Sequence, residues 1–110
     1  AIKENIIPPS ITKEQQQVIY ASEADVLNIA MFGQTAQQWR KENPGQEGNI
    51  RDYSTVEQLL VLANLESMNA EFIRMGLPQS DRLRKLNIIA IQQLKSLVGN
   101  ANLKQLGDGN

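Results

Sequence analysis

Residues 55–75 constrain the fold most, because apolar side chains cover nearly every side of the helix that they predict. Ser54 and Glu57 have the spacing of a capping box at its start, and Gly76 is the residue type expected at its end. A helix that is apolar nearly all round is buried by other elements. We therefore expect it at the centre of the fold, with a narrow solvent strip made of Glu57, Asn64, Ser67 and Glu71.

A second long helix is predicted over about residues 80–98, after the turn-forming sequence LPQSD and before Gly99. Its apolar residues recur every three or four positions on one side, whereas its polar residues lie opposite. This pattern predicts a helix that packs with one face, antiparallel to 55–75. The stripe consists of Leu83, Leu86, Ala90, Leu94 and Leu97.

Shorter helices are predicted in the first half of the chain. Thr12 followed by Gln15 has the form of a capping box and predicts a helix to about Val18, although the β-branched and aromatic residues of 17–20 fit a strand as well. Two more helices should start at Ser22 and Thr35, the first ending at Gly33 and the second before a Pro- and Gly-containing loop at 43–49. The fold class predicted is all-α, a small single-core bundle of four to five helices.

The 110 residues suffice for one domain with one core. Two consecutive prolines, Pro8 and Pro9, are incompatible with a helix interior, so residues 1–11 are predicted to be a linker. The chain opens without Met, and we expect a further domain to precede it. Residues 12–99 form the predicted helical domain, and the polar, Gly-containing residues 100–110 are predicted to be a tail that frays.

Composition restricts the possible functions. The net charge of −1 disfavours binding to duplex DNA, which takes clustered Lys and Arg. Without Cys or His the chain lacks the thiolate nucleophile, the commonest general base and the commonest metal ligand. We predict no catalytic residue, no metal and no cofactor. No apolar run approaches the length of a membrane span, so we expect no membrane association and a cytoplasmic location.

One cluster of polar residues is predicted inside the bundle. Helical geometry places Glu66 and Asn69 on the face of 55–75 that carries Leu59, Leu62, Ala70 and Ile73. A buried carboxylate needs a cation, and Arg40, Arg51 and Arg82 are available. We favour Arg51 because it precedes the helix and can fold back over it. Asn87, beside the stripe of the last helix, completes the predicted semi-buried network.

Two functional alternatives stand beside the structural interpretation. Glu66 with Arg51 could form a polar site for a small ligand or for catalysis, instead of fixing how the helices pack. Trp39 with Arg40 could present an interaction surface, because Trp is common at binding hot spots. The alternative for Trp39 is that it covers one end of the bundle.

Three blocks of sequence together resemble the C-terminal region of bacterial and phage-type KilA-N domain-containing proteins. They are YASEADVLNIAMFGQTAQQWR at 20–40, GNIRDYSTVEQLLVLANLESMNAEFI at 48–73 and LPQSDRLRKLNIIAIQQLKSLVGNANLKQL at 77–106. The opening AIKENIIPP also resembles the junction that follows the KilA-N domain. The resemblance implies that the DNA-binding domain lies outside this chain, and none of its motif residues can be placed here.

These observations lead to one functional expectation. We expect a non-catalytic accessory domain of a DNA-binding protein that mediates oligomerisation or protein–protein interaction. Its partner would be a second copy or another protein, with DNA bound only through the preceding domain. Dimeric DNA-binding proteins use such modules because paired half-sites mirror the symmetry of the protein.

Overall fold

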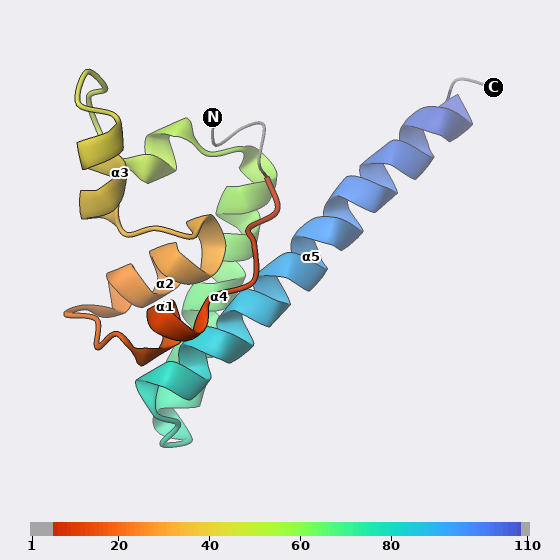
Figure 1. The fold of residues 1–110 in the computed structure, drawn as a ribbon. Helices are drawn as coiled ribbons and strands as arrows, with labels where there is room; N and C mark the ends of the chain where they lie inside the picture. The colour runs from red at the N-terminus through yellow and green to blue at the C-terminus, as the bar shows by residue number, and fades with distance from the viewer. Residues whose placement is uncertain (1–5, 109–110) are drawn as a thin grey trace.

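The computed structural model describes residues 6–108, and within them the side chains as far as residue 99. This part of the chain is all-α and forms a bundle of five helices, with a 3-10 turn, η1, before the fourth (Figure 1). The elements in order are α1 (Lys13–Gln17), α2 (Glu23–Phe32), α3 (Ala36–Glu42), η1 (Ile50–Tyr53), α4 (Val56–Arg74) and α5 (Gln79–Asp108).

The long helix α5 is the common packing partner of α1, α2 and α4, and its C-terminal part extends beyond the rest of the molecule (Figure 1). The apolar stripe predicted for it is confirmed: its first four members are buried and Leu97 is half-buried. They pack against α2 and α4, and each Leu or Ile that is fully buried in this contact stabilises the folded state by about 1.5–3 kcal/mol. The core residues from those two helices are Val26, Leu27, Ile29, Ala30, Met31, Val61, Leu62 and Leu65.

Helix α4 packs antiparallel to α5 as predicted, but its buried face is not the predicted one. Leu59, Glu66 and Ile73, expected to face inwards, are exposed. The buried residues are Gln58, Val61, Leu62, Leu65 and Asn69. Apolar residues on nearly every side leave the rotation of a helix undetermined by its own sequence, and tertiary packing decides it.

Three of the helices begin with the same device. Thr12, Thr35 and Thr55 each accept a hydrogen bond from the backbone N–H three residues on, and the Gln at that third position caps the Thr backbone in return. The first two starts were predicted, and α1 confirms the helix at Lys13–Gln17, whereas residues 18–20 of the segment that could have been a strand form neither helix nor strand. The predicted capping box of Ser54 is wrong by one residue, because the Ser54 hydroxyl instead donates to the Ile50 carbonyl of η1 at 2.8 Å.

The helix ends agree with the sequence at two glycines and disagree at a third. Gly33 and Gly76 both have a φ of 79°, the left-handed conformation that ends α2 and α4. Gly99 lies instead within α5, which continues to Asp108, so the predicted helix end is wrong and residues 100–108 of the predicted tail are helical. A glycine costs a helix interior only about 1 kcal/mol. Residues 109–110 lie outside the described part.

Residues 6–11 are extended, as the prolines require, yet they pack against the core. Ile6, Ile7 and Ile11 contact the core cluster, and Pro8 is buried. The Ile11 backbone N–H donates to Asn87 Oδ1 at 3.0 Å, across 76 positions of sequence. The prediction of a linker is therefore wrong for residues 6–11, because the apolar side chains around the prolines are buried against the core. Residues 1–5 of the predicted linker lie outside the described part. We call residues 6–11 the N-terminal strap.

Candidate functional site

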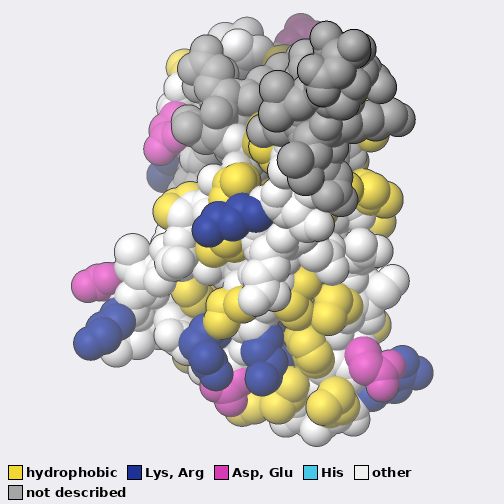
Figure 2. Space-filling model, turned by 90° about the vertical axis from the view of Figure 1, so that its right-hand side faces the viewer, with side chains coloured by type: hydrophobic (Ala, Val, Ile, Leu, Met, Phe, Trp, Pro, Cys, Tyr) yellow, Lys and Arg dark blue, Asp and Glu magenta, His cyan; other side chains and the backbone are white. Residues whose placement is uncertain are grey.

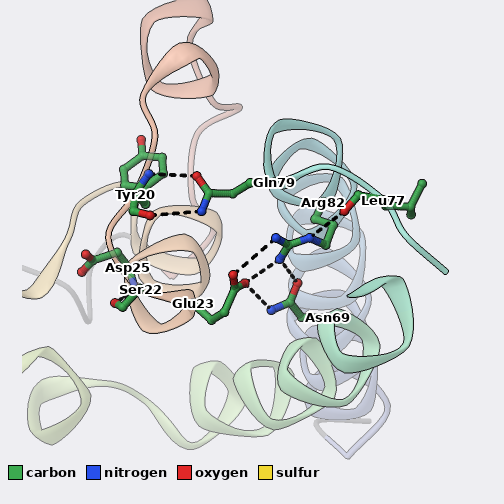
Figure 3. Close-up of polar contacts among 8 residues, drawn as sticks. All are labelled: Tyr20, Ser22, Glu23, Asp25, Asn69, Leu77, Gln79 and Arg82. Atoms are coloured by element: carbon green, nitrogen blue, oxygen red, sulfur yellow. Dashed lines mark hydrogen bonds and ion pairs between the residues drawn. The ribbon is translucent and has the colours of Figure 1, made fainter. Parts of the chain in front are cut away.

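The most connected polar cluster lies where α2, α4 and α5 meet, and consists of Glu23, Asn69 and Arg82 (Figure 3). The Arg82 Nη1 atom lies 2.5 Å from Glu23 Oε1 and 3.0 Å from Asn69 Oδ1. Its Nη2 donates to Glu23 Oε2 at 3.3 Å, so the guanidinium holds both carboxylate oxygens. Asn69 closes the triangle by donating from Nδ2 to Glu23 Oε1 at 2.9 Å. We call these three residues the Arg82 cluster.

Local structure places each member of the cluster. Glu23 opens α2 directly after Ser22, whose hydroxyl accepts from the Asp25 backbone N–H. Asn69 lies on the buried face of α4. Arg82 lies in the first turn of α5, where its Nε donates back to the Leu77 carbonyl at 3.0 Å. The cluster thus ties the start of α2, the inner face of α4 and the turn before α5 to one another.

Burial sets the electrostatics of the cluster. Arg82 is only 7% exposed, and a buried guanidinium requires a counter-charge and hydrogen-bond acceptors. The hydrogen bond from Arg82 lowers the pKa of Glu23; partial burial opposes this, and the bond from Asn69 adds to it. Glu23 is therefore an ionised acceptor at neutral pH. The hydrogen bonds of Arg82 and Asn69 go to each other, to Glu23 and to the Leu77 carbonyl, which is the arrangement of a structural clamp.

A second contact beside the cluster joins the segment before α2 to α5 (Figure 3). The Tyr20 backbone N–H donates to Gln79 Oε1 at 2.8 Å, and Gln79 Nε2 donates to the Tyr20 carbonyl at 3.1 Å. The Tyr20 hydroxyl donates to the Gln15 carbonyl of α1 at 2.8 Å. Burial, and then the negative charge of Asp25, raises the pKa of Tyr20, so its hydroxyl remains a donor.

Asn87 fastens the N-terminal strap. Its Oδ1 accepts from Ile11, and its Nδ2 donates to the carbonyls of Pro9 and Ala30 at 3.2 and 3.1 Å. All these partners are backbone groups, so Asn87 is predicted correctly as buried but does not join Glu66 or Asn69. Gln58 acts similarly from α4, with its Nε2 3.3 Å from the Ile6 carbonyl.

The predicted single network is therefore wrong, although one of its contacts is confirmed. Arg51 Nη1 lies 3.7 Å from Glu66 Oε1, but these side chains are 42% and 48% exposed. The actual rotation of α4 turns Glu66 outwards and Asn69 inwards, so the buried cation is Arg82 rather than Arg51. The sequence did not predict that Glu23 belongs to the polar cluster. An acidic residue in the first turn of a helix is explained by a favourable contact with the helix dipole, and no local signal indicates a distant partner.

Trp39 is buried, so the possible interaction surface with Arg40 is wrong and the interpretation of Trp39 as an interior residue is correct, although it lies outside the core cluster of α2, α4 and α5. Its ring centroid lies 5.2 Å from that of Tyr53, with the planes tilted by 34°. The Tyr53 hydroxyl donates to the Glu47 carbonyl at 2.7 Å, which ties the 43–49 loop to η1. Arg40 is exposed.

One groove of about 560 Å³ lies between the end of α1 and the start of α5. Its lining is mostly amide and apolar, with Lys13 as its one charged residue, and it contains neither Arg51 nor Glu66. Among the side chains that the structure describes, no group of three acidic residues is placed to hold a metal ion. Residues 6–108 contain no helix long and apolar enough to span a membrane.

Large apolar side chains also reach the surface, as on the face shown in Figure 2. Half of the exposed ones among the described side chains come from α4, whose Val56 is 78%, Leu60 54%, Ile73 47% and Leu59 41% exposed. With Ala63, Glu66 and Ala70, which are exposed too, most of these lie along one side of the helix. We call Val56, Leu59, Ala63, Glu66, Ala70 and Ile73 the outer stripe of α4.

Comparison of the chain with models of protein families, with curated proteins and with solved structures gives no match.

Proposed function

We propose that this domain is a non-catalytic accessory module that mediates oligomerisation or protein–protein interaction, attached to a DNA-binding domain of the KilA-N type in the cytoplasm. The observation that carries the proposal is the row of exposed apolar side chains on α4. Exposed apolar surface that is contiguous and rimmed by polar residues is typical of interaction sites.

The polar clusters support a structural rather than a chemical role for the interior. The Arg82 cluster and Asn87 use their donors and acceptors to join helices and the N-terminal strap. The alternative of a ligand or catalytic site at Glu66 and Arg51 loses support, because both side chains lie on an open surface outside the groove. A site for catalysis needs a cleft that excludes water around its titrating groups.

The link to a DNA-binding domain comes from the sequence resemblance to KilA-N proteins. The net charge of −1 fits a division of labour in which another domain contacts the phosphates.

Affinity capture from an extract of the source cells tests the proposal. The baits are the wild-type domain, the full-length parent protein, and a domain carrying Leu59→Asp and Ile73→Asp. Gln92→Asp with Ser96→Asp, on the exposed side of α5, is the matched control. We expect the full-length parent and the wild-type domain to capture a shared set of proteins that includes the parent chain. The control variant should capture the same proteins, and the α4 variant should lose them. Capture of the same proteins by both variants would contradict a role for α4.

A further inference from the structure

The outer stripe of α4 has the spacing of a coiled-coil seam. Its six members, from Val56 to Ile73, follow one another at alternating steps of three and four residues. This is the a and d pattern of a heptad repeat, which keeps one line of side chains facing a partner helix. A neighbouring side of α4 is already buried against α2 and α5. One helix thus carries two apolar faces, and the structure buries one of them.

We propose that the outer stripe binds the outer stripe of a second copy of this chain, with the two α4 helices antiparallel about a two-fold axis between residues 64 and 65. The inference rests on the proposed function and specifies it: the partner is the chain itself, and the contact is a helix pair.

Side-chain size favours the antiparallel orientation. In that orientation Leu59 lies opposite Ala70 of the second copy, and Val56 lies opposite Ile73. Large side chains then meet small ones in the inner layers, as close packing requires. A parallel pair would set Ala63 against Ala63 and Ala70 against Ala70, which leaves gaps, and Leu59 against Leu59.

Charge favours the same orientation. In a parallel pair the two Glu66 carboxylates would lie in one layer and repel each other. In the antiparallel pair each Glu66 lies opposite Ala63 of the other copy, close to the two-fold axis. Arg51, with its Nη1 3.7 Å from Glu66 Oε1 in the same copy, brings a cation to that place. Two carboxylates and two guanidiniums then alternate around the axis, so the charged residue in the middle of the stripe is neutralised.

The size of the contact sets the expected affinity. Stable complexes bury about 800 Å² per partner, and α4 offers a single helix of 19 residues, about 28 Å long. We therefore expect reversible association of the isolated chain, with a dissociation constant of about 10–100 μM.

Sedimentation velocity over about 5–500 μM tests the association. We expect the wild-type mass to rise from 12.3 kDa towards twice that value. Ala63→Glu places a second carboxylate opposite Glu66 of the partner, and should weaken association at least tenfold. Ala63 is exposed, so circular dichroism should report an unchanged fold. Ser96→Glu adds the same charge on the exposed side of α5 and should associate like the wild type.

Spin labels test the orientation, and the absence of Cys allows each label a single site. In the antiparallel dimer Ser67→Cys labels are offset by about 7 Å along the helix axis, and Arg74→Cys labels by about 28 Å. Pulsed electron resonance should therefore give a clearly longer distance for position 74. Equal distances at the two positions would indicate a parallel pair and overturn the proposed geometry.

A wild-type chain that stays at 12.3 kDa at 500 μM would overturn self-association, as would an Ala63→Glu variant that dimerises normally. Neither result would remove the broader proposed function. A monomeric domain whose α4 variant still loses captured proteins would bind a different partner through this stripe. If the capture experiment also shows no dependence on α4, both proposals fail.

Discussion

Arg82 is the only buried charged side chain among those that the structure describes. A guanidinium in this position is stabilised by Glu23, Asn69 and the Leu77 carbonyl together. Such an arrangement fixes the relative positions of the elements that it joins more than it adds net stability, because desolvation offsets much of the attraction. Removing one member, however, leaves the others with unmet hydrogen bonds.

Arg82→Ala should therefore lower the free energy of unfolding by about 2–3 kcal/mol, a value reduced from that of a fully buried pair because Glu23 is partly exposed. Urea denaturation followed by circular dichroism measures the change. Arg84→Ala, an exposed residue two positions on, is the control and should alter stability by about 0.5 kcal/mol or less. Equal effects of the two substitutions would show that the Arg82 cluster does not stabilise the fold.

The lowered pKa of Glu23 gives the cluster a pH dependence. Because the folded state holds the carboxylate ionised, this contribution is complete above about pH 4.3, the pKa of glutamate in an unfolded chain. It is lost as the pH falls through the lower folded value. We expect the difference in urea midpoint between wild type and Glu23→Gln to shrink between about pH 6.5 and pH 3.5. A constant gap for Glu23→Gln would contradict the assignment.

Sequence reasoning identified buried polar positions better than their partners. Asn69 and Asn87 were predicted to lie inside because their helical positions adjoin apolar stripes, and they do. Arg51 was chosen over Arg82 because it is close to α4 along the chain. Proximity in sequence carries little information about contacts such as Glu23 to Arg82, which are separated by 59 positions.

The helices were predicted from the sequence more accurately than the contacts of single residues. Capping residues, glycines and the turn-forming sequence at 77–81 are local signals, and they located the starts of α1, α2, α3 and α5 and the ends of α2 and α4. The rotation of α4 is not a local property, since it depends on which side α2 and α5 cover. Because the predicted rotation of α4 was wrong, Glu66 was expected in the interior and the exposed outer stripe was not predicted.

The N-terminal strap depends on a single side chain of α5. Asn87→Ala removes three hydrogen bonds to backbone groups of the strap and α2, and should cost about 2–3 kcal/mol. Hydrogen exchange by NMR tests this locally, because the Ile11 amide loses its acceptor. We expect exchange at Ile11 to accelerate more than at the Met31 amide within α2. Gln92→Ala, exposed on the same helix, should leave both unchanged. Unaltered protection of Ile11 would refute the strap contact.

At the scale of the whole molecule, charge makes the clearest prediction. With a net charge of −1, the chain should release few counterions from DNA. We expect no saturable binding to a labelled 30-base-pair duplex at 0.1 M salt up to about 100 μM protein, measured by fluorescence anisotropy. A basic DNA-binding protein serves as the positive control. Tight, salt-dependent binding would assign DNA contact to this domain and contradict the proposed division of labour.

The N-terminal strap also has a consequence for the order of folding. Its contact with Asn87 closes a loop of 76 positions, an entropic cost that must be met before the bond forms. The capping interactions of the short helices are local, whereas the strap contact with Asn87 and most of the packing of α2 require α5 to be in place. During synthesis the strap therefore emerges well before the helix that it contacts, and the domain completes its fold only when α5 has left the ribosome.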